Sequence, residues 1–174
     1  LSYLPSSIHE PAPRSDTGRD AGGDATALRR AIPRNPRSVY RIRPIVETVV
    51  DAGSFMEIGR HWGKALATGL ARIDGWPVMV LASDPYHYGG GRGRQAAAKT
   101  VRQVDLAPPF HLPLINFVDV PGFRIGLEAE TEGVMRAGVR ALAAMTQATV
   151  PWCSIIIRKA FGVAAGGHQN ADRF

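Results

Sequence analysis

The sequence predicts an α/β fold in which a mostly parallel sheet is flanked by helices. Three apolar segments have the composition of buried strands. Their centres fall near 79, 116 and 156, about 40 residues apart, which suits β-loop-α units. The first two segments are each followed by a loop and then by a segment with helical periodicity. Strands and helices that alternate in this way form a parallel sheet with helices on its faces.

Residues 1–38, rich in Pro, Arg, Gly, Asp and Ser, are expected to be a flexible segment. Within them, residues 14–26 show no apolar periodicity. The chain of 174 residues carries a formal charge of +6, and much of the basic excess lies in its first quarter. The arginines of that quarter are Arg14, Arg19, Arg29, Arg30, Arg34, Arg37, Arg41 and Arg43. Solvation of a flexible segment is the favoured interpretation, and the alternative is a non-catalytic basic module that binds an acidic partner or nucleic acid.

The first ordered helix is expected within residues 40–59. Apolar residues recur there at helical spacing, and Pro44 is suited to a first turn. The apolar stripe consists of Ile45, Val46, Val49 and Val50. Gly53 is expected to stop the helix.

A β-hairpin and a β-loop-α unit follow this helix. Asp74-Gly75 is a hairpin turn signal between two apolar runs, and the second run, 77–82, has the composition of a strand buried on both faces. After a glycine cluster at 88–93, residues 94–107 are expected to form a helix. Its inner stripe consists of Ala97, Val101 and Val104.

The strand-loop-helix pattern is then repeated. The expected elements are strand 112–120, loop 121–130, helix 131–149, strand 153–158 and loop 160–167. The inner face of the helix consists of Val134, Gly138, Ala141, Leu142 and Met145. Because no further element follows to cover the last strand, the fold is expected to be incomplete and the sequence to be a piece of a larger protein.

Few side chains in this sequence have the arrangement that catalysis requires. Cys153, the only cysteine, opens an apolar strand and is expected to be buried and inert, and a single cysteine fits a reducing, cytoplasmic compartment. Ser83, Asp84 and His87 are close in sequence, but that spacing alone is weak evidence for a triad. The histidines lack the spacing of a zinc helix, so no metal site is predicted.

The glycine-rich loop 89–94 lies between a strand and a helix, a place where loops often bind phosphate. It is not a Walker A loop, because no Gly-Lys-Ser/Thr follows. It also departs from G-x-G-x-x-G, because Arg94 occupies the third glycine position. We expect Gly89 and Gly90 to serve close packing together with some ligand contact.

The main chain after the third strand is itself a candidate site. In "RKAFGVAAGGH" (158–168) the strand ends in small residues and enters a helix, whose first N–H groups lack intrahelical partners. The helix dipole adds partial positive charge there, and small side chains at 162 and 164–167 let a substrate oxygen approach. Such a backbone site can act as an oxyanion hole. The alternative is a strand-to-helix turn needed only for tight packing, and His168 is equally open to a structural or a functional role.

Three stretches of this chain resemble a known enzyme family. They are "NFVDVPGFRIGLEAE" (116–130), "ATVPWCSIIIRKAFGVAAGG" (148–167) and "RIDGWPVMVLASDP" (72–85). Asp-x-Pro-Gly-Phe followed by Arg-Lys-x-Phe/Tyr-Gly is similar to the C-terminal half of the carboxyltransferase (β) subunit of biotin-dependent acyl-CoA carboxylases, of the propionyl-, acetyl- and methylcrotonyl-CoA type. "LSYLPS" (1–6) looks like the end of the family's N-terminal half. The likeness covers nearly everything except residues 11–38.

The resemblance implies a crotonase-like (ClpP/crotonase) ββα superhelix. Residues 1–38 would be a linker and a remnant of the N-terminal half, and residues 39–174 a partial C-terminal, biotin-side domain. In the family, carboxybiotin releases its carboxyl group, backbone N–H groups stabilise the enolate-like ureido oxygen of biotin, and biotin nitrogen removes the α-proton of the acyl-CoA. The α-carbon then captures CO₂. This chemistry needs no side-chain base.

The family's site residues carry over to named positions of this chain. The Gly-Gly-Ala that follows Phe/Tyr corresponds to Gly162, Val163 and Ala164, so the N–H groups of Val163 and Ala164 would face the biotin oxygen. Val163 departs from the family's glycine and would be strained at positive φ. Gly166 corresponds to a position that helps some members to choose among acyl groups, and Gly122 and Phe123 would shape the pocket wall.

The resemblance also implies partners for this chain. These are biotin, as carboxybiotin on a carrier protein or biotin carboxylase subunit, an acyl-CoA substrate of the acetyl or propionyl type, and further copies in a homo-oligomer. Nucleic acid is not among them, and neither is a membrane, because no run of about 18 apolar residues is present. A crotonase-fold acyl-CoA decarboxylase or hydrolase is a further alternative.

Overall fold

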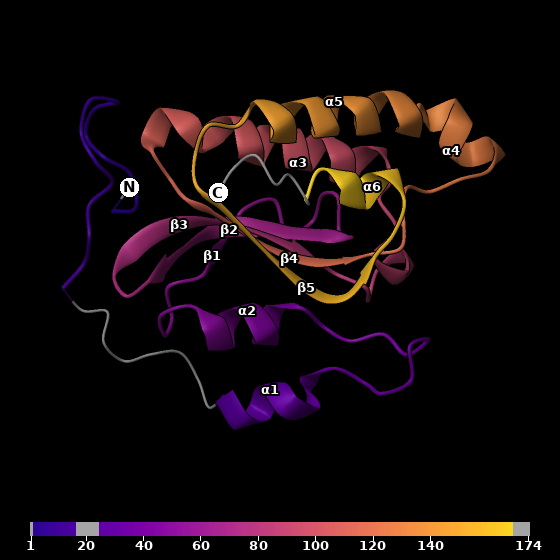
Figure 1. Cartoon of the computed structure of the whole chain (residues 1–174), viewed down its shortest axis with the longest axis horizontal. Coiled ribbons are helices and arrows are strands. Elements are labelled where there is room, and N and C mark those ends of the chain that lie inside the picture. The colour runs from indigo at the N-terminus through magenta and orange to yellow at the C-terminus, as the bar shows by residue number, and fades with distance from the viewer. Residues whose placement is uncertain (1, 17–24, 169–174) are drawn as a thin grey trace.

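The computed structural model describes residues 2–16 and 25–168 and shows a single five-stranded sheet between two layers of helices (Figure 1). The strands lie in chain order across the sheet. They are β1 (Met56–Glu57), β2 (Leu66–Ile73), β3 (Trp76–Ser83), β4 (Leu114–Val120) and β5 (Trp152–Ala160). None of the described helices is long and apolar enough to cross a membrane.

The sheet is mixed, which corrects the expectation of a mostly parallel one. β3, β4 and β5 pair in parallel, but β1–β2 and β2–β3 pair antiparallel. The antiparallel pairing of β2 and β3 follows from their two-residue connection. Asp74 and Gly75 both have positive φ, 49° and 77°, as the tight hairpin turn requires. The hairpin itself is therefore confirmed, and the parallel half of the sheet is the half that the β-loop-α pattern predicted.

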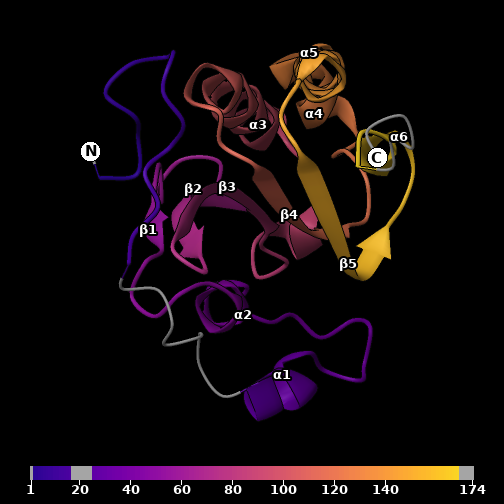
Figure 2. The same ribbon diagram turned by 60° about the vertical axis from the view of Figure 1, so that its left-hand side comes forward.

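Helices cover both faces of the sheet, as Figures 1 and 2 show from two directions. α3 (Arg94–Leu106) and α5 (Val134–Gln147) lie on one face, and α2 (Arg43–Val49) and α1 (Ala25–Ala31) lie on the other. Alternate residues of β3 divide between the two cores. Met79 and Leu81 pack toward α3 and α5, whereas Val78 and Val80 pack toward α2.

Two expectations about the first helix are wrong in detail. Ile45, Val46 and Val50 are buried as predicted, but Val49 is exposed. The helix ends at Val49 rather than at Gly53, because Val50 is already extended at its C-terminus. Gly53, with φ +68°, lies in the turn that leads to β1.

The N-terminal segment is more ordered than its composition predicts. α1 is a helix of seven residues that packs near α2, within the span expected to be flexible. The first residues dock on the β2–β3 hairpin, where the Arg14 guanidinium pairs with Asp74 at 2.6 Å and the Ser15 amide donates to the Gly75 carbonyl at 3.0 Å. The expectation failed because these partners lie about 60 residues away in sequence. Residues 17–24 lie outside the described chain.

The second half of the chain follows the predicted order with small differences. Residues 127–130, expected to be part of a loop, belong to the short helix α4 (Leu127–Glu132), and Gly133 separates α4 from α5. The predicted inner residues of α3 and α5 are buried, except Val101 and Leu142, which are half-buried. Cys153 is exposed, not buried, because β5 is the last strand described in the sheet. After β5 the chain forms α6 (Val163–Gly166).

Candidate active site

The loops that follow β3, β4 and β5 meet at one edge of the sheet. Since these strands are parallel, their carboxyl ends lie together, which is where ligands bind in open α/β sheets. The loops are joined by main-chain hydrogen bonds: the Arg92 amide donates to the Gly122 carbonyl at 3.0 Å, and the Phe161 amide donates to the Val120 carbonyl at 3.0 Å. The predicted site residues from three distant segments are thus brought to one place.

The start of α6 presents main-chain amides at this edge. Gly162 precedes the helix with φ 62° and ψ −162°, a conformation open essentially to glycine alone. The first hydrogen bond of the turn runs from the Ala165 amide to the Gly162 carbonyl at 3.1 Å, so the amides of Val163 and Ala164 precede it. Val163 itself does not have positive φ, because Gly162 takes up the unusual conformation. Its β-branched side chain therefore causes no backbone strain, and it is 63% exposed.

The remaining predicted residues divide into open and packed positions. A Cβ atom added at Gly89, Gly122, Gly162 or Gly166 would meet no atom within 4 Å. In contrast, a Cβ atom at Gly90 would lie 2.4 Å from the Asp119 carbonyl oxygen, so Gly90 serves the close approach of two loops. Gly90 therefore serves close packing, as expected, whereas the other four glycines leave open space around the main chain.

Phe123 is packed beneath α6. Its ring lies so close to α5 that a Cβ atom at Gly138 would be 2.7 Å from it, and it belongs to the apolar cluster of Val118, Val120, Ala164 and Ala165. The side chain therefore supports the position of α6 on α5. Its main chain pairs with that of Arg92 in an isolated parallel bridge.

A polar cluster that sequence reasoning largely missed is buried below α6. Arg92 is 5% exposed, and its Nη2 donates to Ser83 Oγ at 3.1 Å. Asn116 Nδ2 lies 2.6 Å from His168 Nδ1. Burial first, and then the charge of Arg92, lower the pKa of His168 to about 3, so its ring is neutral near pH 7. The only signal in the sequence was His168 itself, because an arginine in a glycine-rich loop is typical of a surface.

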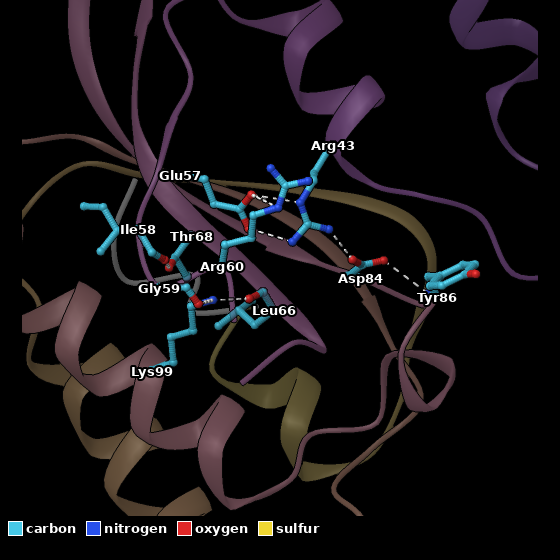
Figure 3. A network of polar contacts seen from close by, with 10 residues as sticks. All are labelled: Arg43, Glu57, Ile58, Gly59, Arg60, Leu66, Thr68, Asp84, Tyr86 and Lys99. Atoms are coloured by element: carbon cyan, nitrogen blue, oxygen red, sulfur yellow. Dashed lines mark hydrogen bonds and ion pairs between the residues drawn. The ribbon is translucent and has the colours of Figure 1, made fainter. Parts of the chain in front are cut away.

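A second polar network holds the start of the loop after β3 (Figure 3). The Arg43 guanidinium donates to both carboxylate oxygens of Glu57, at 2.9 and 2.6 Å, and to Asp84 Oδ2 at 2.6 Å. These hydrogen bonds, those to Glu57 most, raise the pKa of Arg43. Asp84 also accepts from the Tyr86 amide at 3.2 Å. The network therefore fixes the first residues of the segment that leads to Gly89 and Gly90.

Lys99 forms a neighbouring set of hydrogen bonds with the segment between β1 and β2. Its Nζ is buried and donates to the carbonyls of Gly59 and Leu66, at 2.9 and 2.7 Å (Figure 3). Burial lowers the pKa of Lys99 to about 8. The side chain ties α3 to the segment between β1 and β2, and it does not point to the edge where α6 begins.

An open cavity of about 270 Å³ adjoins the glycine-rich loop. Its lining contains charges of both signs, from Lys64 and Arg94 and from Glu128 and Glu132. Arg124, also in the lining, pairs with Glu128 at 2.9 Å and stacks over the Tyr88 ring. The arrangement offers room beside the carboxyl edge for a polar ligand.

Comparison with known proteins places this geometry in context. Residues 1–172 match the family described as carboxyl transferase domain. The chain is 36% identical over 176 residues to a propionyl-CoA carboxylase, carboxyltransferase subunit, from Haloferax mediterranei, covering 99% of this chain and 34% of that protein. It is 35% identical to methylmalonyl-CoA decarboxylase subunit alpha of Veillonella parvula, covering 93% and 32%.

Solved structures agree with the sequence comparison. The crystal structure of the transcarboxylase 12S hexamer superimposes with a TM-score of 0.92 at 32% identity, over 99% of this chain and 34% of that one. The β subunit of geranyl-CoA carboxylase from P. aeruginosa superimposes with a TM-score of 0.80 at 23% identity, a likeness of fold alone. The chain spans about a third of the length of the curated relatives it matches.

Proposed function

Because the chain belongs to the carboxyl transferase domain family, we propose that it is the biotin-facing part of an acyl-CoA carboxyltransferase subunit. The family and the crotonase-like α/β fold predicted from the sequence are confirmed by the family match and by the superposition on related carboxyltransferases. The division at residue 38 and the roles of single residues stay predictions, and they are part of this proposal.

One observation carries the proposal: α6 begins at an exposed Gly162 and Val163, with the buried Ala164 directly after them. Gly162 and Gly166 leave free space around the turn, and the amides of Val163 and Ala164 precede its first hydrogen bond. A flat, neutral ring such as that of biotin fits beside the open glycines and the exposed apolar side chains of Phe161 and Val163. Its carbonyl oxygen can accept from two adjacent N–H groups.

Main-chain amides at this edge, and not side chains, would stabilise the charge that develops in the reaction. Bound carboxybiotin supplies the carboxyl group that is transferred. The amides of Val163 and Ala164 donate to the ring oxygen that gains negative charge as this group leaves. Removal of one such donor typically costs about 2.7–4 kcal/mol of barrier. Phe161 and Val163, the exposed side chains at the turn, are apolar, so no proton transfer is assigned to them.

Supporting residues keep these amides in place. Gly122 leaves the neighbouring loop open, and Phe123 holds α6 against α5. Gly90 allows the loop after β3 to approach the Asp119 carbonyl closely, and the space around Gly89 in the same loop is open. We propose that Gly89, Gly122 and Gly166 border the bound ring, and that Gly90 acts through packing.

The substrates and partners of the whole protein are also proposed. We infer an acyl-CoA of the acetyl or propionyl type, a biotin carrier protein or biotin carboxylase subunit, a homo-oligomer, and a cytoplasmic location. The named relatives support this range: one is a propionyl-CoA carboxylase subunit, and the transcarboxylase 12S structure is a hexamer. A methylmalonyl-CoA decarboxylase subunit among the relatives favours a second candidate, the reverse direction at the same site. Dependence on carboxybiotin would separate both from a hydrolase.

A pair of glycine variants tests the proposed amide site. Gly162→Ala would force alanine into a conformation reserved for glycine and shift the first turn of α6, at a cost of about 1–3 kcal/mol. Gly53→Ala is the matched control, because Gly53 also has positive φ, +68°, and open space but lies in the turn before β1. The readout is a titration of the labelled chain with biocytin, followed through its amide NMR signals.

We expect biocytin to shift the Val163 and Ala164 signals of the wild-type chain and of Gly53→Ala. In Gly162→Ala these shifts should be lost or need at least tenfold more ligand, although both variants lose similar stability. Shifts that spare Val163 and Ala164 in the wild type would refute the backbone site. Equal binding by both variants would refute the role of Gly162.

A further inference from the structure

A small cavity lies below α6, beside the polar cluster of Arg92 and His168. Its volume is about 10 Å³, enough for one particle of the size of water. Arg92, Thr100, Phe123, Ala164 and His168 are among its lining residues. Gly162 does not line the cavity, whereas the buried Ala164 does, so the cavity lies directly beneath the turn of α6.

Arg92 brings an uncompensated positive charge to this cavity. Within the chain that the structure describes, Nη1 of Arg92 is buried and has no hydrogen-bond partner, and no carboxylate pairs with the guanidinium. Its one side-chain partner is the neutral hydroxyl of Ser83. A buried charge normally has an oppositely charged or well hydrogen-bonded partner, because desolvation costs several kcal/mol. An anion would supply both the missing hydrogen bond and the missing charge.

The other polar groups around the cavity also favour an anion. The neutral ring of His168 carries one N–H, and if Nδ1 accepts from Asn116 Nδ2, that proton lies on Nε2. The hydroxyl of Thr100 donates to the Ala96 carbonyl within its own helix. No acidic side chain is among the lining residues. The cavity thus offers N–H donors and a full positive charge.

We propose that Arg92 and His168 form a binding site for a small monovalent anion of the size of chloride. The site holds the anion against Nη1 of Arg92, and it stabilises the packing of α6 on α3 and α5. The cavity volume suits a single small ion, which favours a halide over larger anions. The inference goes beyond carboxyl transfer and does not require biotin to bind.

Thermal unfolding in exchanged salts tests the site. At constant ionic strength, sodium chloride replaces sodium gluconate, whose anion is far larger than a halide. Chloride at about ten times its dissociation constant should raise the folded-to-unfolded ratio about elevenfold, and the effect should saturate. Arg92→Met should abolish this dependence. Arg94→Met is the matched control, since Arg94 is exposed two residues away and should leave the dependence intact.

Crystals of the wild-type chain grown in bromide give an independent measurement. An anomalous peak within hydrogen-bond distance of Arg92 Nη1 is expected, and it decides the question even if Arg92→Met fails to fold. Three results would overturn the proposal: equal stability in chloride and gluconate, chloride dependence that persists in Arg92→Met, or a water without anomalous signal in the cavity.

Discussion

Each face of the sheet holds an arginine with little solvent exposure, but the charge of the two is compensated differently. On the α2 face, Arg158 Nε lies 3.2 Å from Asp119 Oδ2, and its Nη1 donates to the Ser38 carbonyl at 2.8 Å. On the α3 and α5 face, Arg92 has the Ser83 hydroxyl and no acidic partner among the described residues. The charge of Arg158 is therefore compensated within the fold, whereas the charge of Arg92 is available to a ligand.

The pKa shifts around the two arginines have different causes. The Tyr40 hydroxyl donates to Asp119 at 2.7 Å, and burial together with this carboxylate raises the pKa of Tyr40. The Asp119 carboxylate also accepts from the Lys159 amide at 3.2 Å. Around Arg92, burial alone lowers the pKa of the guanidinium to about 10. Even so, Arg92 is cationic near pH 7, so the charge persists without compensation.

The largest effect is expected from Arg158→Met. This change leaves the fully buried Asp119 carboxylate without its cation, and breaking a buried pair on one side costs about 3–5 kcal/mol. Urea unfolding at pH 7 measures the loss in the free energy of unfolding. Arg102→Met, at an exposed arginine of α3, is the control and should change stability by less than about 0.5 kcal/mol. A loss below about 1 kcal/mol in Arg158→Met would mean that the α2 face does not depend on its ion pair.

The difference between the faces also marks the limit of sequence reasoning. Strands 77–82, 112–120 and 153–158 were predictable because each is a short, nearly continuous apolar run of strand length. The glycines of the three loops could be placed together because parallel strands end at one edge. These inferences need only local pattern and topology.

The buried polar residues could not be predicted in this way. Tyr40 and Asp119 are 79 residues apart in sequence, and Arg158 on β5 contacts Asp119 on the neighbouring strand β4. Arg92 and Lys99 belong to residue types that are almost never fully buried without a partner. Their positions depend on packing among distant segments. The order of α1 and of the docked residues 2–16 was missed for the same reason.

An intermediate effect is expected from acid on the Arg92 face. The pKa of His168 falls from 6.5 to about 3 on folding, so the folded state binds the proton less well than the unfolded state. Its contribution to stability is full above pH 6.5 and is lost as the pH falls toward 3. The loss is at most about 1.4 kcal/mol per pH unit. We expect the free energy of unfolding to fall more steeply between pH 6.5 and 4 in the wild type than in His168→Gln, and equal slopes would contradict a buried neutral ring.

The smallest effect, and the sharpest contrast with Arg158, is expected from Arg92→Met in a buffer without halide. The change removes a charge and leaves no buried carboxylate behind, so it should be neutral or slightly stabilising, within about 1 kcal/mol of the wild type. Urea unfolding in gluconate measures it beside Arg158→Met. A loss as large as that of Arg158→Met would show that Arg92 is compensated within the fold. The two arginines would then be equivalent, and the reason to expect an anion below α6 would disappear.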